Sequence, residues 1–133
     1  MTAQHGDYHI GNMIITPSNE IAVIDFNRFD IGDPWEEFNR ITWSSSVSKY
    51  FVTGQINGYF NNDVPDEFFK LLALYIGSNQ LASIPWAVDF GEDEVSTMIN
   101  EANKVIRDYD FYKTYIPCWY IGNYDEVMKL ISK

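Results

Sequence analysis

The sequence predicts an α+β fold in which helices dominate. Two short β-rich runs separated by turn residues lie near the start of the chain, and most of the remainder carries apolar residues at helical spacing. Apolar residues make up 46% of the 133 residues and aromatic residues 17%, which is enough for a packed core. We therefore expect a single domain over residues 1–133, with one small hairpin and about five helices.

The predicted hairpin consists of the runs MIIT and EIAVID, which are joined by the turn sequence PSN. If Thr16 pairs near Ile21, then Asn12 pairs near Asp25, because paired positions in an antiparallel ladder keep a constant sum. The open end of the hairpin then holds an amide beside a carboxylate. Asp7 lies in the loop that enters this end, so three oxygen-bearing side chains are expected to converge there.

The five predicted helices differ in how clearly the sequence marks them. The first begins at Asp33, which can cap it, with Pro34 at the first helical position and Glu36 where a capping box requires it. The fourth has the most regular apolar stripe, with an apolar residue every three or four positions. In order, the predicted helices cover residues 33–44, 49–60, a segment that follows Pro65, 92–109 and 125–131.

Charge and cysteine content narrow the class of protein. The net charge of -10, from 19 acidic and 9 basic residues, argues against nucleic-acid binding and is compatible with a cationic small-molecule substrate. The single cysteine, Cys118, rules out an internal disulfide and lies in the apolar run YIPCWY, where burial is the better explanation than catalysis. No run of residues reaches the roughly 18 apolar positions of a membrane span. We therefore expect a cytoplasmic protein with no membrane partner.

The oxygen-bearing side chains of Asp7, Asn12 and Asp25 suit a hard cation such as Mg²⁺, whose remaining ligands are usually waters and substrate phosphates. Taken singly, Asp7 and Asn12 are explained equally well as turn caps. A calcium loop is the competing metal hypothesis, because residues 25–30 (DFNRFD) begin like a calcium-binding loop. That hypothesis is disfavoured, since Phe29 takes the third ligand position and an aspartate takes the glycine position.

Three motifs together resemble the catalytic segment of aminoglycoside phosphotransferases and related small-molecule kinases. They are HGDYHIGN at residues 5–12, IDF at 24–26 and GDPW at 32–35. Their order matches the kinase layout of an aspartate, an asparagine five residues later and a second aspartate after a short hairpin. The resemblance continues more loosely through GYF at 58–60 and PCWY at 117–120. It implies the C-terminal, large lobe of a protein-kinase-like fold.

The resemblance implies specific roles for three residues. Asp7 corresponds to the catalytic aspartate, which orients the attacking hydroxyl and accepts its proton. Asn12 corresponds to the metal ligand of the catalytic loop, and Asp25 to the aspartate that holds Mg²⁺ against the phosphates of ATP. The expected cofactor is therefore Mg²⁺, with ATP as co-substrate.

The resemblance implies supporting roles for other residues. His5 and His9 are expected to stabilise the loop, and Asp33 to combine a helix cap with tethering of the loop. Gly6 stands where protein kinases carry arginine, so control by a phosphorylated activation loop is not expected. Asn27 replaces the glycine of the DFG motif, which leaves the metal role of the preceding aspartate intact.

The acceptor of the phosphoryl group is expected to be a small, cationic molecule such as an aminoglycoside. The densest acidic cluster, a candidate contact for its amines, consists of Asp89, Glu92, Asp93 and Glu94. The alternative is that these acids only favour a helix N-terminus through its dipole. Because kinases with this signature also act on choline, homoserine or sugars, the acceptor stays open.

Kinase chemistry also requires a glycine-rich loop over the phosphates and a strand lysine paired with a glutamate. Both belong to a small lobe that precedes the catalytic loop in the enzymes that this chain resembles, whereas four residues precede His5 here. We therefore expect that the nucleotide lobe is absent and that this C-terminal part is inactive alone. The alternative is a non-catalytic remnant that binds a partner or self-associates through the surface left by the missing lobe.

Overall fold

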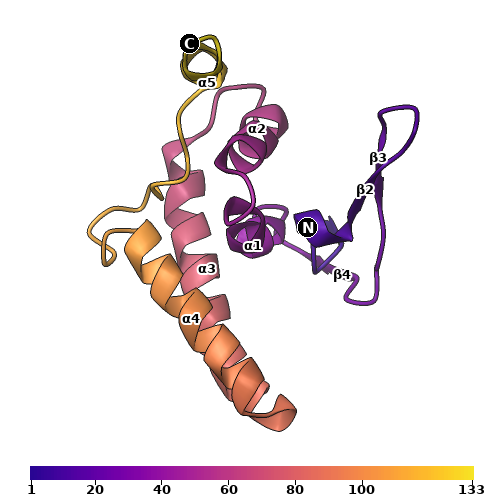
Figure 1. Ribbon diagram of the computed structural model, residues 1–133, viewed down its shortest axis with the longest axis vertical. Coiled ribbons are helices and arrows are strands. Elements are labelled where there is room, and N and C mark those ends of the chain that lie inside the picture. Colours follow the sequence, from indigo (N-terminus) through magenta and orange to yellow (C-terminus); the bar gives the residue numbers. More distant parts are fainter.

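A computed structural model describes residues 1–133 and confirms the predicted α+β, mainly helical fold (Figure 1). The strands form two antiparallel pairs, β1 (Thr2–Gln4) with β4 (Asp30–Gly32) and β2 (Met13–Ile15) with β3 (Ile21–Val23). The α-helices are α1 (Ile41–Ser45), α2 (Lys49–Tyr59), α3 (Asp66–Ala87), α4 (Glu92–Asp108) and α5 (Tyr124–Ile131). Three short 3₁₀ helices are η1 (Ile10–Asn12), η2 (Glu36–Arg40) and η3 (Val88–Phe90).

The predicted hairpin forms, but its register differs by one residue from the predicted one. Thr16 pairs with Glu20, whose carbonyl accepts its N–H at 2.9 Å, and not with Ile21. The turn closes over three residues because Asn19 adopts a left-handed conformation, with φ of 61°. Asparagine tolerates this conformation better than most residues, which makes the shorter loop possible.

The shift in register moves the two predicted metal ligands out of direct cross-strand pairing. Asn12 lies opposite Ile24, whose N–H donates to the Asn12 carbonyl at 3.0 Å, and Asp25 is the next residue along the chain. Asp25 has a φ of 67° and is exposed, so the chain turns sharply where it leaves the hairpin. The two residues therefore remain neighbours at the open end of the hairpin.

The β1–β4 pair was not predicted, because the run TAQ carries no strand signal of its own. Its register joins Thr2 to Gly32 and Gln4 to Asp30, so the pair closes a loop that contains the whole hairpin. In Figure 1 the N-terminus therefore lies beside β4 and α1. This closure fixes the position of the HGDYHIGN segment, which begins directly after β1.

The first predicted helix is divided into η2 and α1. The Asp33 carboxylate accepts the Trp35 N–H at 3.0 Å and the Asp33 carbonyl accepts the Glu36 N–H at 3.0 Å, so Asp33 does cap the segment. The predicted capping box is wrong, because Glu36 makes no side-chain hydrogen bond back to the cap. The first turns instead wind as a 3₁₀ helix, and the following residue, Glu37, reaches the loop at residues 5–12.

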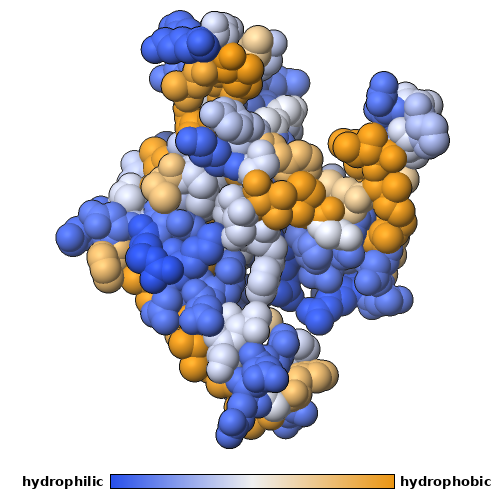
Figure 2. Space-filling view, viewed as in Figure 1, coloured by the Kyte–Doolittle hydropathy of each residue, from blue (hydrophilic) through white to orange (hydrophobic).

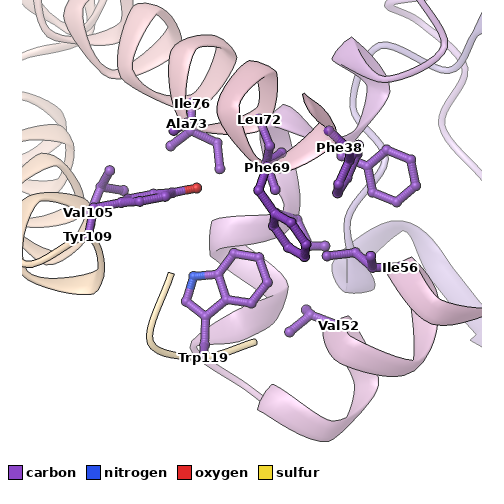
Figure 3. Close-up of a cluster of buried hydrophobic side chains, with 12 residues drawn as sticks. Phe38, Val52, Ile56, Phe69, Leu72, Ala73, Ile76, Val105, Tyr109 and Trp119 are labelled. Carbon is purple, nitrogen blue, oxygen red and sulfur yellow. The ribbon is translucent and has the colours of Figure 1, made fainter. Parts of the chain in front are cut away.

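The hydrophobic core lies between α2, α3, the C-terminal half of α4 and the segment before α5 (Figure 3). Its buried residues are Phe38, Ile41, Val52, Ile56, Phe68, Phe69, Leu72, Ala73, Ile76, Val105, Tyr109 and Trp119. Aromatic rings meet edge to face within it, as between Phe38 and Phe68 at 5.2 Å. Ile99, expected in the apolar stripe of α4, is 43% exposed because the N-terminal part of α4 extends beyond the core.

The segment before α5 is fastened to α2 by buried polar side chains. Thr53 donates to the Trp119 carbonyl at 3.3 Å. The Asn57 amide donates to the Gly122 carbonyl at 2.9 Å and accepts the Tyr120 hydroxyl at 2.8 Å. These bonds satisfy backbone groups of an irregular segment that would otherwise lack partners.

Two parts of the molecule project from the core. The antiparallel pair α3 and α4 extends in one direction, and the β2–β3 hairpin extends as a separate arm in another (Figure 1). Apolar side chains cover much of this arm (Figure 2), and the exposed ones are Ile14, Ile15, Ile21 and Ile24. We call these four residues the apolar arm. None of the helices combines the length and the apolar character that crossing a membrane requires.

Candidate active site

The loop at residues 5–12 forms one side of a cleft of about 600 Å³. Asp7, His9, Ile10 and Gly11 line that side, and the opposite wall belongs to the second half of α3 and the start of α4. The wall residues are Asn79, Ala82, Ser83, Trp86, Glu94 and Met98. A cleft of this size, lined by a mixture of apolar, polar and charged side chains, can hold a small molecule.

Asp7 lies between two basic side chains. Its Oδ1 atom is 3.6 Å from Arg40 Nε and its Oδ2 atom is 3.7 Å from His9 Nε2. Burial lowers the pKa of the Arg40 guanidinium, an effect that Asp7 opposes and Arg28 reinforces. The Nε atom of Arg40 is buried and has no hydrogen-bond partner. The cleft therefore holds an aspartate and a poorly solvated cation in direct contact.

Asn12 contacts Asp7 directly. The Asn12 amide nitrogen donates to the Asp7 carbonyl at 2.9 Å and approaches the Asp7 carboxylate at 3.5 Å, which leaves the amide oxygen without a partner. One Asp25 oxygen accepts the Asn27 amide at 2.5 Å. No group of three or more His, Cys, Asp or Glu side chains gathers anywhere in the chain. The available donors, one amide oxygen and one carboxylate, fit a cation that takes most of its ligands from phosphates and water.

His5 connects the loop to the end of the hairpin. Its Nδ1 atom accepts the Asp7 N–H at 3.3 Å, and its Nε2 atom lies 2.8 Å from the Ile24 carbonyl oxygen. Both bonds form when the ring is neutral and carries its proton on Nε2. The ring is buried and packs against Phe26 with centroids 4.4 Å apart. A single side chain thus sets the spacing between the segments that carry Asp7 and Asp25.

Glu37 anchors the start of the loop. Its two carboxylate oxygens accept the backbone N–H groups of His5 at 2.5 Å and Gly6 at 3.0 Å. Gly6 has a φ of 78°, and a Cβ there would overlap the carbonyl oxygen of Arg28. The loop therefore requires glycine at this position, and the conformation that glycine permits turns both N–H groups toward one carboxylate.

Asp33 is bonded to two other parts of the fold. Its carboxylate accepts the Tyr75 hydroxyl at 2.6 Å, and its carbonyl accepts the Gln4 amide at 2.5 Å. The bond from Tyr75 lowers the pKa of Asp33, and the same bond raises the pKa of Tyr75 to about 12. Asp33 thus joins β1 to α3 in addition to capping η2.

Only some of the predicted site residues line the cleft, namely Asp7, His9 and Glu94. Asp7, Asn12, His5 and His9 lie in one loop, and His9 Nδ1 accepts the Gly11 N–H at 3.1 Å. Of the acidic cluster, Glu94 lines the cleft. The other three do not line it: Asp89, Glu92 and Asp93.

Five residues of the site were missed as candidates, namely Arg28, Glu37, Arg40, Trp43 and Trp86. Four of them stand outside the motifs, and Glu37 stands where the kinases that the chain resembles often carry aspartate. Arg28 reaches the opposite wall, where its guanidinium carbon lies 6.0 Å from the centre of the Trp86 ring. Each joins the site only because the chain folds, so no local sequence signal could have selected it.

A loop that presents an aspartate beside an asparagine, next to a hairpin that ends in a second aspartate, is the arrangement that phosphoryl-transfer enzymes use. A family model described as the phosphotransferase enzyme family matches residues 1–68, which include the loop, the hairpin and η2. The chain belongs to this family. No curated protein and no solved structure matches the chain.

Proposed function

We propose that this chain carries the catalytic loop of an ATP-dependent phosphotransferase that transfers the γ-phosphoryl group to a hydroxyl of a small molecule. The observation that carries the proposal is the placement of Asp7. Asp7 lines a cleft large enough for an acceptor, and the Asn12 amide donates to the Asp7 backbone carbonyl at 2.9 Å and lies 3.5 Å from its carboxylate. Asp7 orients the acceptor hydroxyl and takes its proton as the oxygen attacks phosphorus.

Arg40 and His9 flank Asp7, with Arg40 Nε 3.6 Å and His9 Nε2 3.7 Å from the carboxylate that would accept the proton. Because Arg40 Nε is buried without a hydrogen-bond partner, its charge is weakly screened. A weakly screened cation beside the base also stabilises negative charge on the group in transfer. Arg40 thus acts on both the base, Asp7, and the phosphoryl group in transfer.

Mg²⁺ is the cation that suits the donors present, and Asn12 and Asp25 are the residues that would hold it. When bound, Mg²⁺ neutralises charge on the β- and γ-phosphates of ATP. The free amide oxygen of Asn12 and the exposed carboxylate of Asp25 leave most ligand positions to phosphates and waters, as Mg²⁺ prefers. His5 keeps these two ligands in register by bonding to both segments.

The acceptor is a small hydroxylated amine, the class to which the aminoglycosides belong. Glu94 supports this assignment, because it lines the cleft opposite Asp7 and forms no ion pair or hydrogen bond of its own. Trp43 and Trp86 add aromatic surface on which an ammonium group can rest.

ATP would be bound by a separate nucleotide-binding lobe, and the apolar arm is the surface that such a lobe would cover. Ile15 is 75% exposed and Ile21 59% exposed, although both belong to strands. A hairpin that leaves branched apolar side chains in water is typical of a surface buried in a larger assembly. Residues 1–133 alone are then expected to transfer no phosphoryl group.

The test is a phosphotransfer screen with the protein expressed from its complete gene. Release of ADP is followed by a coupled assay, and the product by ³¹P NMR, across aminoglycosides and other amino alcohols. Asp7→Asn should lower kcat at least a hundredfold, as expected for a lost general base. Asp89→Asn, outside the cleft, should leave kcat unchanged. Turnover that survives Asp7→Asn would contradict the proposal.

The apolar arm also favours a second candidate, a non-catalytic module that self-associates. Sedimentation velocity distinguishes the two functions for residues 1–133. If the arm joins two copies, the chain sediments as a dimer, and Ile15→Lys with Ile21→Lys returns it to a monomer. Leu81→Lys, at a position on α3 that is 77% exposed, is the matched control. A monomer at every concentration removes this candidate.

A further inference from the structure

The charged side chains of the cleft do not have equal numbers of partners. Asp7 lies beside Arg40 and His9. Arg28 and Glu94 line the same cleft, and neither forms an ion pair with any residue of the chain. The cleft therefore contains one free cation and one free anion once the charges around Asp7 are paired.

The charges that line the cleft do not suit an acceptor that carries several positive charges. An acceptor with several amines requires an excess of carboxylates, but the charges that line the cleft, Asp7 and Glu94 against Arg28 and Arg40, sum to zero with His9 neutral. An extra amine on the acceptor would meet a guanidinium, and like charges in a partly desolvated cleft repel one another.

Arg28 belongs to the acceptor side of the cleft. Its guanidinium carbon lies 6.0 Å from the centre of the Trp86 ring, on the wall that α3 provides. Arg40, in contrast, contacts the catalytic aspartate. Arg28 thus lies against the α3 wall without an ion-pair partner, whereas Arg40 lies against Asp7.

We propose that the acceptor is a hydroxylated zwitterion, with an ammonium group at Glu94, an acidic group at Arg28 and the reacting hydroxyl between them at Asp7. This inference rests on the proposed function, which it narrows. Trp43 and Trp86 contact the carbon skeleton between the charged groups. The guanidinium binds a carboxylate or a phosphate of the acceptor through paired N–H donors.

The test uses binding, so that it does not depend on turnover. Residues 1–133 are titrated with 4-amino-3-hydroxybutyrate, which places a hydroxyl between an ammonium and a carboxylate. The matched compounds are 1-aminopropan-2-ol, which lacks the carboxylate, and 3-hydroxybutyrate, which lacks the ammonium. Kanamycin is the polycation. The indole N–H signals of Trp43 and Trp86 report binding in the cleft, and those of Trp35 and Trp119, which pack in the core, are internal references.

We expect 4-amino-3-hydroxybutyrate to bind about fivefold more tightly than either matched compound, which is the effect of one partly exposed ion pair. Kanamycin should bind more weakly than the zwitterion. Glu94→Gln should remove the advantage over 3-hydroxybutyrate, and Arg28→Gln the advantage over 1-aminopropan-2-ol. Glu92→Gln and Arg107→Gln, outside the cleft, should change neither.

Three results would overturn the inference. The first is tighter binding of kanamycin than of the zwitterion, and the second is no shift of either cleft indole with any zwitterion concentration up to saturation of the buffer. The third is an Arg28→Gln variant that loses affinity for inorganic phosphate alone, which would assign Arg28 to the transferred group. Phosphotransfer that depends on Asp7 could still be found in each case, so the proposed function is tested separately.

Discussion

Replacing Glu37 with glutamine removes the anchor of the loop at residues 5–12 while keeping the size of the side chain. The carboxylate accepts two backbone N–H groups, from His5 at 2.5 Å and Gly6 at 3.0 Å. Glutamine offers one oxygen and one NH₂ group, so one of the two N–H groups would face another donor. We expect Glu37→Gln to disturb both the stability of the domain and the placement of Asp7.

The magnitude follows from the number and kind of bonds. A hydrogen bond to a charged group contributes about 1.5–3 kcal/mol, and a buried donor left unsatisfied adds its desolvation cost. Since the residue is only partly buried and the second bond survives, we expect a loss of about 2 kcal/mol in the free energy of unfolding. For a domain of this length, that loss lowers Tm by roughly 5–10 °C.

The assay is urea denaturation followed by tryptophan fluorescence, with the midpoint and the slope fitted together. Glu36→Gln is the control, because the neighbouring glutamate makes no side-chain hydrogen bond. It should change the free energy of unfolding by less than about 0.5 kcal/mol, as surface substitutions do. Equal midpoints for the two variants would show that the carboxylate of Glu37 does not hold the loop.

Three further predictions test other parts of the site and its support. Gly6→Ala should lower the free energy of unfolding by at least about 1–2 kcal/mol in the same urea assay, because alanine disfavours a φ of 78° and its Cβ overlaps the backbone of Arg28; a neutral effect would contradict the loop geometry. Tyr75→Phe should make stability less dependent on pH, measured as Tm against pH. In the wild type the folded-state pKa of Asp33 is depressed below 3.8, so the bond stabilises above that pH and is lost as the pH falls through the folded-state value. The pKa of Tyr75 is raised from 10.0 to about 12, so its contribution is complete below pH 10 and is lost as the pH rises toward 12; Tm curves that coincide in both ranges would refute this. Asn57→Ala should cost about 1–3 kcal/mol and speed hydrogen exchange at residues 119–122, since it removes two buried bonds; exchange unchanged there would contradict the role of Asn57.

Most of the helices and the hairpin could be predicted because the residues that mark each element are close together in the sequence. The helix predicted at 92–109 from its apolar spacing forms as α4 (Glu92–Asp108), and the hairpin predicted from two β-rich runs forms as β2 and β3. The predicted register of the hairpin was wrong because it depends on whether Asn19 adopts a left-handed conformation, which its neighbours in sequence do not decide. The β1–β4 pair was not predicted for a related reason, since it joins Gln4 to Asp30 and so depends on contacts between residues far apart in the chain.

The candidate site was predictable only where a motif marks it. Asp7, Asn12 and Asp25 stand at fixed spacings that the chemistry requires, so they could be selected from the sequence. Glu37 and Arg40 could not, because their roles depend on the turn at which η2 brings them back to the loop. The separation of Glu94 from the other acidic residues likewise depends on which side of α4 faces the cleft.

The match to the family ends at residue 68, whereas the wall that faces Asp7 begins at Asn79. The loop that carries Asp7 and the helical wall that faces it are thus far apart in the sequence, although Arg28 and Trp43, which also line the cleft, lie within the matched residues. Substitutions of the wall residues on α3 and α4 are expected to alter which compound binds in the cleft without changing the loop that carries Asp7. This placement offers an engineering route, in which the wall residues of α3 and α4 are varied while the loop at residues 5–12 is kept.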